Sequence, residues 1–437
     1  MSLATPEQIR KLQQGLYLKA KAEPDFRFYS LYDKIYRTDV LHHAYRQVRS
    51  NHGAPGVDGV SIEKIEAQGV DEWLAGLQTE LRTRQYRPKP VRRVMIPKPG
   101  GGERPLGIPT LRDRVAQMAA KMVLEPIFEA DFEPNAYGYR PGRSAGDAIK
   151  RVHTLLIQGY TDVVDADLSK YFDTIPHDAL LKSVARRVVD GAMLELIKFW
   201  LKAPVEESGH DGGKRLTGGA ASTCGTPQGG VISPLLANLY MNRMLKYWRR
   251  RDCGARFQAE IVSYADDFVI LSRGKAEPAL EWAKESLGRI HLVLNEKKTS
   301  LRDARKEMFD FLGYSFGQSR YWKTGQAYTS ASPSAKSVSR VKENVRAVLQ
   351  GNHNTPWEDV RDQLNMKLRG WASYFNYGSV RKPYRAVNHY VCDQVRHFLA
   401  RRHKLPTRGC RRFSWSSIFG ELGVSELNRR KDAPSCA

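Results

Sequence analysis

Two adjacent aspartates, Asp266 and Asp267, stand between apolar segments at residues 261–264 and 268–271 of this 437-residue sequence. This pattern predicts two buried strands joined by a tight turn that carries both acids. Two buried carboxylates repel each other unless cations neutralise them, and oxygen ligands favour hard divalent ions such as Mg²⁺. An exposed β-turn, in which aspartate is frequent, is the alternative interpretation of these two residues taken alone.

A second acidic segment makes metal chemistry the better interpretation. Residues 163–168 form another apolar stretch, and this stretch contains Asp165 and Asp167. If it lies beside the first pair of strands, three carboxylates meet at one point. Two-metal phosphoryl transfer requires such a site, because one ion activates a 3′-hydroxyl and the other holds a triphosphate. Asp165 and Asp167 share one face of a strand, so alternation does not choose between them.

The elements that must position these acids follow from the spacing of apolar residues. Helical spacing predicts helices, and alternating or continuous apolar runs predict strands. The expected helices cover residues 32–50, 70–86, 111–130, 144–158, 178–203 and 233–250, and the expected strands cover residues 91–96, 163–168 and 261–271. Glycines at 100–102 predict a hairpin. After about residue 330 the pattern becomes helical, and residues 330–337 are expected to be a linker between domains.

The net charge indicates an anionic partner. The sequence has 70 Lys and Arg against 47 Asp and Glu, which gives +23 and a pI near 9.8. Because the surplus is spread along the chain, it favours nucleic-acid phosphates over a membrane surface. Five scattered cysteines argue against a zinc site or a disulfide scaffold. With no run of 18 apolar residues and no signal core, the sequence predicts a protein without a membrane span, located in the bacterial cytoplasm and associated with the nucleoid when it acts on DNA.

Nine segments occur in the order that is found in group II intron reverse transcriptases, also called maturases, and the sequence resembles that family on this basis. The segments are residues 51–65, 87–117, 132–149, 163–177, 225–244, 262–271, 294–301, 311–316 and 368–378. The resemblance implies an α+β right-hand polymerase. Its fingers and palm, with an antiparallel palm sheet, would be followed by an α-helical thumb or maturase domain.

The resemblance assigns catalytic roles to four residues. Asp167, Asp266 and Asp267 match the aspartates that bind two Mg²⁺ ions, for which Mn²⁺ can substitute. Lys298 matches a lysine proposed to protonate the departing pyrophosphate, with its neighbour Lys297 as the alternative and an ordinary surface charge as a further one. Asp165 and Asp173, which lie in the same matching segment as Asp167, are expected to be structural.

Four further residues match contacts to the incoming deoxynucleotide. Lys98 and Arg104 flank the glycine hairpin and match a pair that grips the triphosphate. Phe172 corresponds to a ring that excludes a ribose 2′-hydroxyl, although on periodicity alone it would be a core aromatic. Gln228 lies among glycines and matches a glutamine near the sugar and base of the nucleotide. An ordinary loop amide is the alternative for Gln228, as a solvated hairpin is for the two cations.

Several residues are expected to bind nucleic acid. Tyr139 and Arg140 match the region where template and palm meet, with core packing as the competing role for the tyrosine. Residues 331–412 hold 17 Lys and Arg against 5 Asp and Glu. In this basic region the aromatic side chains are expected to form a helical core while the cations touch RNA or DNA. The cations expected to do so are Arg369, Arg401, Arg402, Arg411 and Arg412.

Four regions are expected: an N-terminal extension at 1–30, fingers and palm at 31–330, a thumb or maturase domain at 331–400, and a short basic tail at 401–437 that is a possible DNA-binding remnant. Longer members of the family end in a nuclease with paired cysteines. Only about sixty residues follow Gly378, so the nuclease is expected to be absent.

The predicted function is that of an RNA-directed DNA polymerase of a group II intron, which copies RNA into cDNA and assists intron splicing and mobility. Its expected partners are structured intron RNA, an RNA template with a DNA primer, target DNA and deoxynucleoside triphosphates, with the oligomeric state left open. One alternative is a host-adapted reverse transcriptase that serves DNA repair, phage defence or CRISPR spacer acquisition. Another is a splicing-only RNA-binding maturase, and the intact Asp167, Asp266 and Asp267 argue against it.

Overall fold

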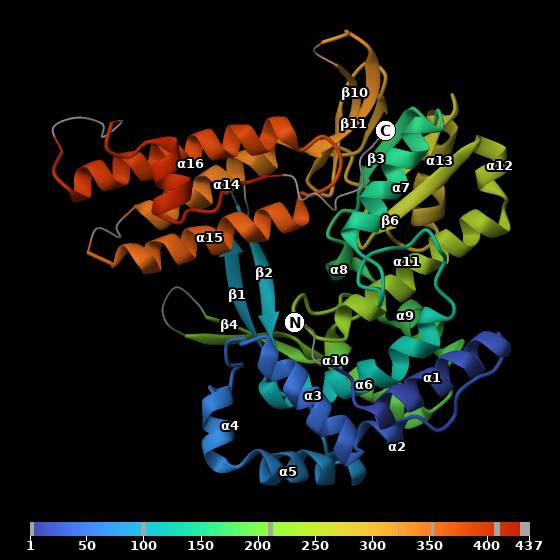
Figure 1. The fold of residues 1–437 in the computed structure, drawn as a ribbon. Helices are drawn as coiled ribbons and strands as arrows, with labels where there is room; N and C mark the ends of the chain where they lie inside the picture. The colour runs from blue at the N-terminus through green and yellow to red at the C-terminus, as the bar shows by residue number, and fades with distance from the viewer. Residues whose placement is uncertain are drawn as a thin grey trace.

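The N-terminal region is a helical layer around one long, almost completely buried helix. The computed structural model describes residues 4–97, 102–208, 213–321, 323–350, 354–405 and 411–428. The helices of this layer are α1 (Glu7–Ala22), α2 (Tyr32–Ile35), α3 (Thr38–Ser50), α4 (Ile62–Gln68), α5 (Val70–Arg82) and the central α6 (Leu111–Glu129) (Figure 1). α1 and α3 both pack against α6. Ile9, Leu16 and Ala20 of α1 are buried in this core, so α1 is part of it and not the extension that the sequence predicted.

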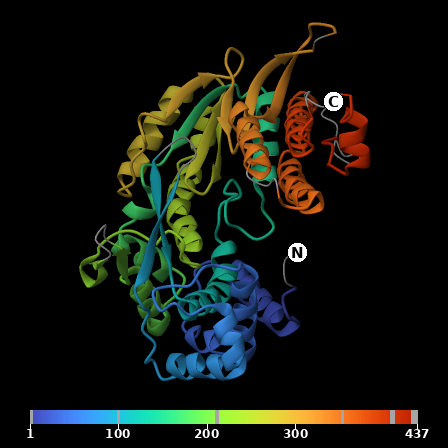
Figure 2. The ribbon, with the colours of Figure 1, turned by 90° about the vertical axis from the view of Figure 1, so that its left-hand side faces the viewer.

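A four-stranded sheet rises from this layer. Its strands are β1 (Val91–Pro97), β2 (Glu103–Ile108), β4 (Pro204–Ser208) and β5 (Lys214–Gly218), in the order β2-β1-β4-β5. β1 and β2 form the predicted hairpin, in which Ile96 pairs with Arg104, whereas β4 runs parallel to β1. Arg104 therefore lies near the tip of a projecting ribbon (Figure 2).

The central sheet carries the aspartates. Its strands are β3 (Asp162–Asp167), β6 (Ala259–Tyr264), β7 (Asp267–Ser272) and β8 (Ser300–Asp303), in the order β6-β7-β3-β8, with every pair antiparallel. Both faces are buried, because Val164 packs with the main core and Val163 with a smaller one. The helices around this sheet are α7 (Ala145–Ile157), α8 (Tyr171–Thr174), α9 (His177–Ala185), α10 (Gly191–Leu201), α11 (Ser233–Arg250), α12 (Cys253–Phe257) and α13 (Ala276–Gly288).

A three-stranded sheet leads from the central sheet to a helical domain. Its strands are β9 (Phe309–Phe311), β10 (Tyr314–Arg320) and β11 (Ala327–Pro333), and the helices that follow are α14 (Ala335–Leu349), α15 (Trp357–Tyr374) and α16 (Arg381–Arg402). The linker expected at 330–337 is therefore wrong. β11 ends at Pro333, and the Ser334 side chain caps α14 by accepting a hydrogen bond from the backbone N–H of Ser337.

The helical domain includes residues that the sequence assigned to a loose tail. Phe413, Ile418, Val424 and Leu427 are buried in its core together with α14, α15 and α16. The side chain of Asn388 both donates to and accepts from the backbone of Leu427, at 3.0 and 2.9 Å. The segment 411–428, with its short π-helix η2 (Ser417–Glu421), is thus an integral part of this domain.

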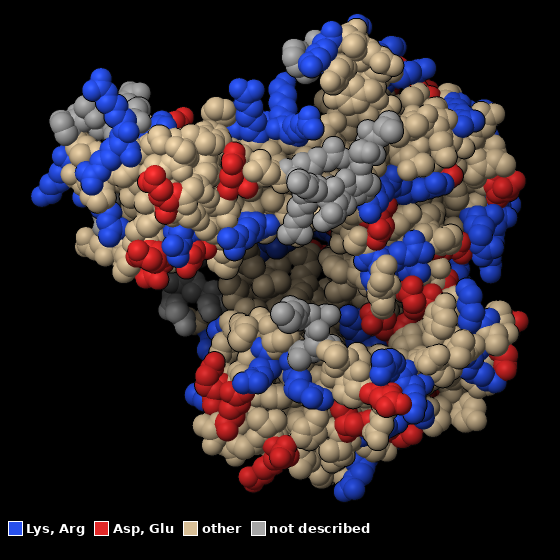
Figure 3. Space-filling model, in the orientation of Figure 1, with Lys and Arg blue, Asp and Glu red and all other residues tan. Residues whose placement is uncertain are grey.

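The described chain matches the predicted fold class, with mixed α and β elements first and helices last. Among the described residues, no helix is long and apolar enough to cross a membrane. The helical domain stands opposite the N-terminal layer, and the central sheet joins them at one side (Figures 1 and 2). The space-filling view shows a deep hollow between these two parts (Figure 3).

Candidate active site

The strand register brings two of the three aspartates face to face. Asp167 at the end of β3 pairs directly with Asp267 at the start of β7. Residues directly opposite each other in an antiparallel pair project from the same face, with Cβ atoms about 5 Å apart. Asp266 lies in the turn between β6 and β7, where Ala265 adopts a left-handed φ of 59°. The predicted hairpin with its two acids is confirmed in this geometry.

The electrostatics of the turn are those of a site that needs cations. Burial, together with the charges of Asp266, Asp167 and Asp165, raises the pKa of Asp267 to about 7. Burial also raises the pKa of Asp266, with a smaller contribution from Asp167. The carboxylates therefore destabilise one another's charged forms, and a nearby positive charge would relieve this.

Asp167 already has a cationic partner. The ammonium of Lys298 lies 3.0 Å from its Oδ2, and the amide of Asn295 donates to the same oxygen at 3.3 Å. The loop that carries both side chains is fixed to β3, because the backbone N–H of Asn295 donates to the Asp167 carbonyl at 2.8 Å. Between the two lysines that the sequence left open, Lys298 is the one with a recorded contact to an aspartate.

A polar cavity of about 510 Å³ opens beside these aspartates. Asp165, Asp167 and Asp267 line one wall, with Arg302 and Lys336 among the other lining residues. Burial raises the pKa of Asp165 to about 6, while Arg302 and Lys336 act in the opposite direction. Asp165 therefore lies near cations of the chain itself.

The donor set fits a divalent metal in its chemistry. Asp167, Asp266 and Asp267 supply only carboxylate oxygens, which is the ligand type that Mg²⁺ prefers. Their mutual repulsion and the Lys298 ammonium at Asp167 both mark a position for positive charge. Among the described residues, however, no three Asp, Glu, His or Cys side chains surround a common metal position as they stand. The backbone thus brings these carboxylates together, and their side chains would have to turn to share an ion.

The loop that contains Gln228 lies between the hairpin sheet and α8. The backbone N–H of Gly107 in β2 donates to the Gln228 carbonyl at 2.5 Å. On the other side, the backbone N–H of Thr226 donates to the Phe172 carbonyl at 2.7 Å. Gln228 and Phe172, which the sequence assigned to one nucleotide pocket, are therefore linked by one short loop. The Phe172 ring is half-buried against the main core.

Lys98 and Arg104 are the two cations that the sequence predicts to grip a triphosphate, and Lys98 lies outside the described residues. Arg104 is exposed, and its charge and that of Asp266 both act on the phenol of Tyr139, whose pKa is raised first by burial. Tyr139 is 49% exposed and has a left-handed φ of 53°. These three side chains, from β2, the 137–140 turn and the 264–267 turn, therefore share one neighbourhood.

Arg140 does not have the role that the sequence predicted. It is 8% exposed, and its guanidinium donates to the Glu129 carboxylate at 2.7 Å and to the carbonyls of Glu133 and Ala136, each at 2.7 Å. With its donors engaged inside the protein, it cannot also grip a phosphate. Its role is to fix the turn that presents Tyr139.

The cations that the sequence predicted to bind nucleic acid in the helical domain differ in exposure and in their hydrogen bonds to the protein. The described part of the structure shows Arg401, Arg411 and Arg412 exposed. Arg369 donates to the Ser425 hydroxyl at 3.0 Å, and Arg402 donates to the Thr355 carbonyl at 2.7 Å. Basic side chains gather at the end of the domain where α16 finishes (Figure 3).

Sequence reasoning missed Asn295. Its amide contacts Asp167, and its backbone holds the Lys298 loop in place. The residue lies in the matching segment 294–301, so the signal was its position three residues before Lys298. An asparagine in a polar loop gives no signal of its own.

Comparison with known proteins defines the class. Residues 96–316 match the family described as "Reverse transcriptase (RNA-dependent DNA polymerase)", and residues 338–415 match "Group II intron, maturase-specific domain". The chain belongs to the reverse transcriptase family, in its group II intron branch, and is an RNA-directed DNA polymerase. The central sheet is accordingly the palm, the hairpin sheet and N-terminal layer are the fingers, and the helical domain is the thumb.

Among individual proteins, the chain is similar to Protein YkfC of Escherichia coli K12, with 36% identity over 344 residues that cover 70% of this chain and 87% of that protein. It is also similar to the group II intron-encoded protein LtrA of Lactococcus lactis, with 29% identity over 357 residues, 66% of this chain and 56% of LtrA. The chain therefore spans little more than half of LtrA. A telomerase structure from Candida albicans, in complex with a telomeric RNA fragment, aligns with a TM-score of 0.43 and 12% identity over 79% of this chain and 68% of that one.

Proposed function

We propose that this chain copies RNA into DNA at a site formed by Asp167, Asp266 and Asp267, and that its template and partner is a group II intron RNA whose splicing and mobility it assists. The single observation that supports the catalytic site best is the register that sets Asp167 directly opposite Asp267, with Asp266 in the adjoining turn. The maturase-specific match at residues 338–415 supports the intron partner.

The proposed chemistry assigns each residue one task. Asp167, Asp266 and Asp267 would hold two Mg²⁺ ions, which when bound activate the primer 3′-hydroxyl and stabilise the charge on the triphosphate. Lys298, whose ammonium lies 3.0 Å from Asp167, would give a proton to the departing pyrophosphate. The ring of Phe172 would exclude a 2′-hydroxyl.

The remaining residues bind and orient the substrates. Gln228 would contact the sugar and base, Arg104 the triphosphate and Tyr139 the template. The hollow between fingers and thumb would hold the RNA template with its DNA primer (Figure 3). Arg401, Arg411 and Arg412 would contact the backbone of intron RNA or target DNA, because exposed guanidinium groups can bind phosphates without reading sequence.

The catalytic half of the proposal is tested by Asp266→Asn. This change should lower primer extension on an RNA template by about 100-fold or more, since a metal ligand is lost. Gel-shift affinity for RNA should stay unchanged, because the basic surface is intact. Asp178→Asn, an exposed aspartate on α9, is the matched control and should extend normally. More than a few per cent of normal extension by Asp266→Asn would refute the assignment.

The intron half is tested separately by competition. The protein should bind a folded group II intron RNA more tightly than an unstructured RNA of equal length at the same salt concentration. Equal affinities would leave a polymerase without an intron partner.

A further inference from the structure

The Gln228 loop, defined as residues 226–230, forms backbone hydrogen bonds with two segments that carry residues proposed above to contact the nucleotide. It binds the Phe172 carbonyl through the Thr226 N–H at 2.7 Å, and it binds β2, which carries Arg104, through the Gly107 N–H at 2.5 Å. There is no space at the second junction, because a Cβ on Gly229, whose φ is +110°, would collide with the Gly107 carbonyl oxygen. A contact that fixes the position of this loop therefore also fixes the positions of Phe172 and Arg104 relative to each other.

One buried side chain from a different part of the fold anchors the far end of the loop. The Gln117 Oε1 of α6 accepts from the backbone N–H of Val231 at 2.8 Å and from that of Ile232 at 3.4 Å. These two N–H groups directly precede α11, and they have no carbonyl partner from a preceding turn. Gln117 is 5% exposed, and a Cβ on Gly230 would lie 3.3 Å from its oxygen.

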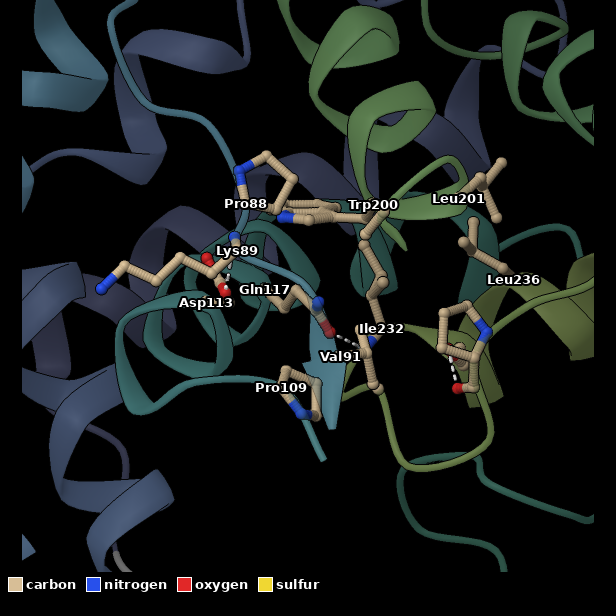
Figure 4. A pocket seen from close by; sticks show the side chains of 14 residues that line it. Pro88, Lys89, Val91, Pro109, Asp113, Gln117, Trp200, Leu201, Ile232 and Leu236 are labelled. Atoms are coloured by element: carbon tan, nitrogen blue, oxygen red, sulfur yellow. Dashed lines mark hydrogen bonds between the residues drawn. The ribbon is translucent and has the colours of Figure 1, made fainter. Parts of the chain in front are cut away.

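The pocket around Gln117 leaves little room for a water molecule to replace this contact. The pocket around Gln117 has a volume of only about 10 Å³, and its walls include Pro88, Trp200 and Leu236 (Figure 4). A water molecule needs at least about 10–15 Å³ and several polar partners. In Figure 4 the Gln117 amide points across this pocket to the backbone at Ile232. Loss of its oxygen would leave the partly buried N–H of Val231 and the buried N–H of Ile232 without this acceptor, so we expect the loop to move.

The helix that carries Gln117 is itself held rigidly at this point. Asp113, one turn earlier on α6, accepts from the Tyr86 hydroxyl and the Thr110 hydroxyl, each at 2.7 Å. The Trp200 indole in turn donates to the Tyr86 oxygen at 3.1 Å. Asp113 of α6 is thus connected through Tyr86 to α10, and Gln117, one turn later on α6, contacts the backbone before α11.

We propose that Gln117 is a positioning residue for nucleotide selection. It does not touch the nucleotide but acts through the backbone of residues 229–232, and it sets where Gln228 lies relative to Phe172. This inference rests on the proposed function, since it deepens the account of the same deoxynucleotide pocket.

The test replaces Gln117 with Met, which is unbranched and of similar length but has no comparable acceptor. At saturating primer and template, Gln117→Met should raise the KM for deoxynucleotides about 5- to 10-fold, the effect expected for a buried donor left unpaired. The preference for deoxynucleotides over ribonucleotides should also fall, whereas the affinity for the primer–template should not change. Gln117→Glu keeps an acceptor at the N-terminal end of α11, where negative charge is favoured, and should restore the wild-type KM.

The matched control is Asn365→Leu in the thumb. Asn365 is also 5% exposed, and its amide likewise holds a loop, accepting from the Ser425 N–H at 2.7 Å. This control should lower the melting temperature without changing the KM for nucleotides. If Gln117→Met melts like the control and keeps the wild-type KM and sugar preference, Gln117 is merely structural and the inference is overturned. Failure of Gln117→Glu to restore the KM would overturn it as well.

If Gln117→Met does not fold, the milder variant Ser233→Ala can be measured in its place. Ser233→Ala removes a hydroxyl that donates to the Pro227 carbonyl at 2.9 Å and so holds the same loop from the other side. It should raise the same KM about 2- to 3-fold, and an unchanged KM would refute the role of the loop. Failure of the proposed function is distinguishable, because the wild-type protein would then show no extension at all.

Discussion

Replacing Asp267 by Asn should stabilise the metal-free protein while it abolishes polymerase activity. Asp267 is partly buried next to Asp266 and Asp167, and within the described residues its carboxylate accepts no hydrogen bond. Its pKa is raised from the ordinary 3.8 to about 7, mainly by burial. At 1.36 kcal/mol per pH unit, the charged carboxylate lowers the free energy of unfolding by about 4 kcal/mol. Asparagine has nearly the same shape and no charge.

The sign and pH window of this effect follow from linkage. The folded pKa lies above the unfolded one, so the folded state binds more protons and loses stability as pH rises from about 4 to about 7. The Asn variant lacks this loss. Its advantage should therefore be close to zero near pH 4, less than about 2 kcal/mol at pH 5 and about 4 kcal/mol at pH 8.

Thermal melting in EDTA at pH 5 and pH 8 measures the difference between the two proteins. At pH 8, Asp267→Asn should melt a few degrees higher than the wild type, with Asp178→Asn as the control for loss of an exposed charge. Added Mg²⁺ should stabilise the wild type more than the variant and narrow the gap, because the ion binds only the folded, charged site. A variant that melts at or below the wild type at pH 8, or a difference independent of pH, would refute the reasoning.

Three further predictions concern the gate, the palm–thumb contact and the C-terminal segment. Phe172→Ala should raise ribonucleotide incorporation by about tenfold or more in single-nucleotide kinetics, and an unchanged sugar preference would make Phe172 only a core residue. Burial lowers the pKa of His153, whose ring contacts the Tyr377 hydroxyl at 2.8 Å, so stability should fall as pH drops below about 6.5. His153→Gln should flatten that dependence in melts between pH 7.5 and 5.5. Ile418→Ala should cost about 2–4 kcal/mol of stability, because Ile418 is fully buried, whereas a loose tail would show no change.

The sequence predicted the elements of this fold well where one pattern dominates a long stretch. The helix predicted at 111–130 is α6 (Leu111–Glu129), and the one predicted at 233–250 is α11 with the same bounds. The apolar run at 261–271 resolves into β6 and β7 with the turn between them. Here local spacing and tertiary burial agree, so the pattern was sufficient.

Predictions failed where a contact distant in sequence decides the outcome. α1 has only three buried residues in 16, so it read as a polar extension although they dock on α6. The segment after residue 410 read as a basic tail, because Phe413 and Ile418 are widely spaced apolar residues without a regular period. Short strands such as β9, with three residues, leave no periodicity to find.

In the candidate site, the sequence predicted the aspartates that would bind metal but not the residues that fix the backbone around the site. The aspartates could be found because a second acidic strand and the resemblance to a known family pointed to the same three residues, whereas the adjacent pair alone left an exposed turn as the alternative. Arg140 was expected to contact nucleic acid and Gln117 was not singled out, since the sequence does not show whether a polar residue on a helix or turn faces solvent or the buried backbone. Their partners, Glu129 for Arg140 and the backbone before α11 for Gln117, are fixed only by the folded chain.

Residues that fix the backbone are needed because the candidate site residues lie outside regular secondary structure. Asp266, Tyr139 and Gln228 all lie in turns or loops, which have no regular ladder of hydrogen bonds to fix them. The structure fixes the first two by pressing their turns together: the Tyr137 N–H donates to the Ser263 carbonyl at 2.8 Å, and Gly138 leaves no room for a side chain against Ala265. The Gln228 loop is held in a similar way against β2, by the Gly107 N–H and the close approach of Gly229, and the buried amide of Gln117 anchors its far end. Rigidity at the proposed nucleotide pocket therefore depends on Gln117, a buried side chain to which the sequence pattern assigned no role.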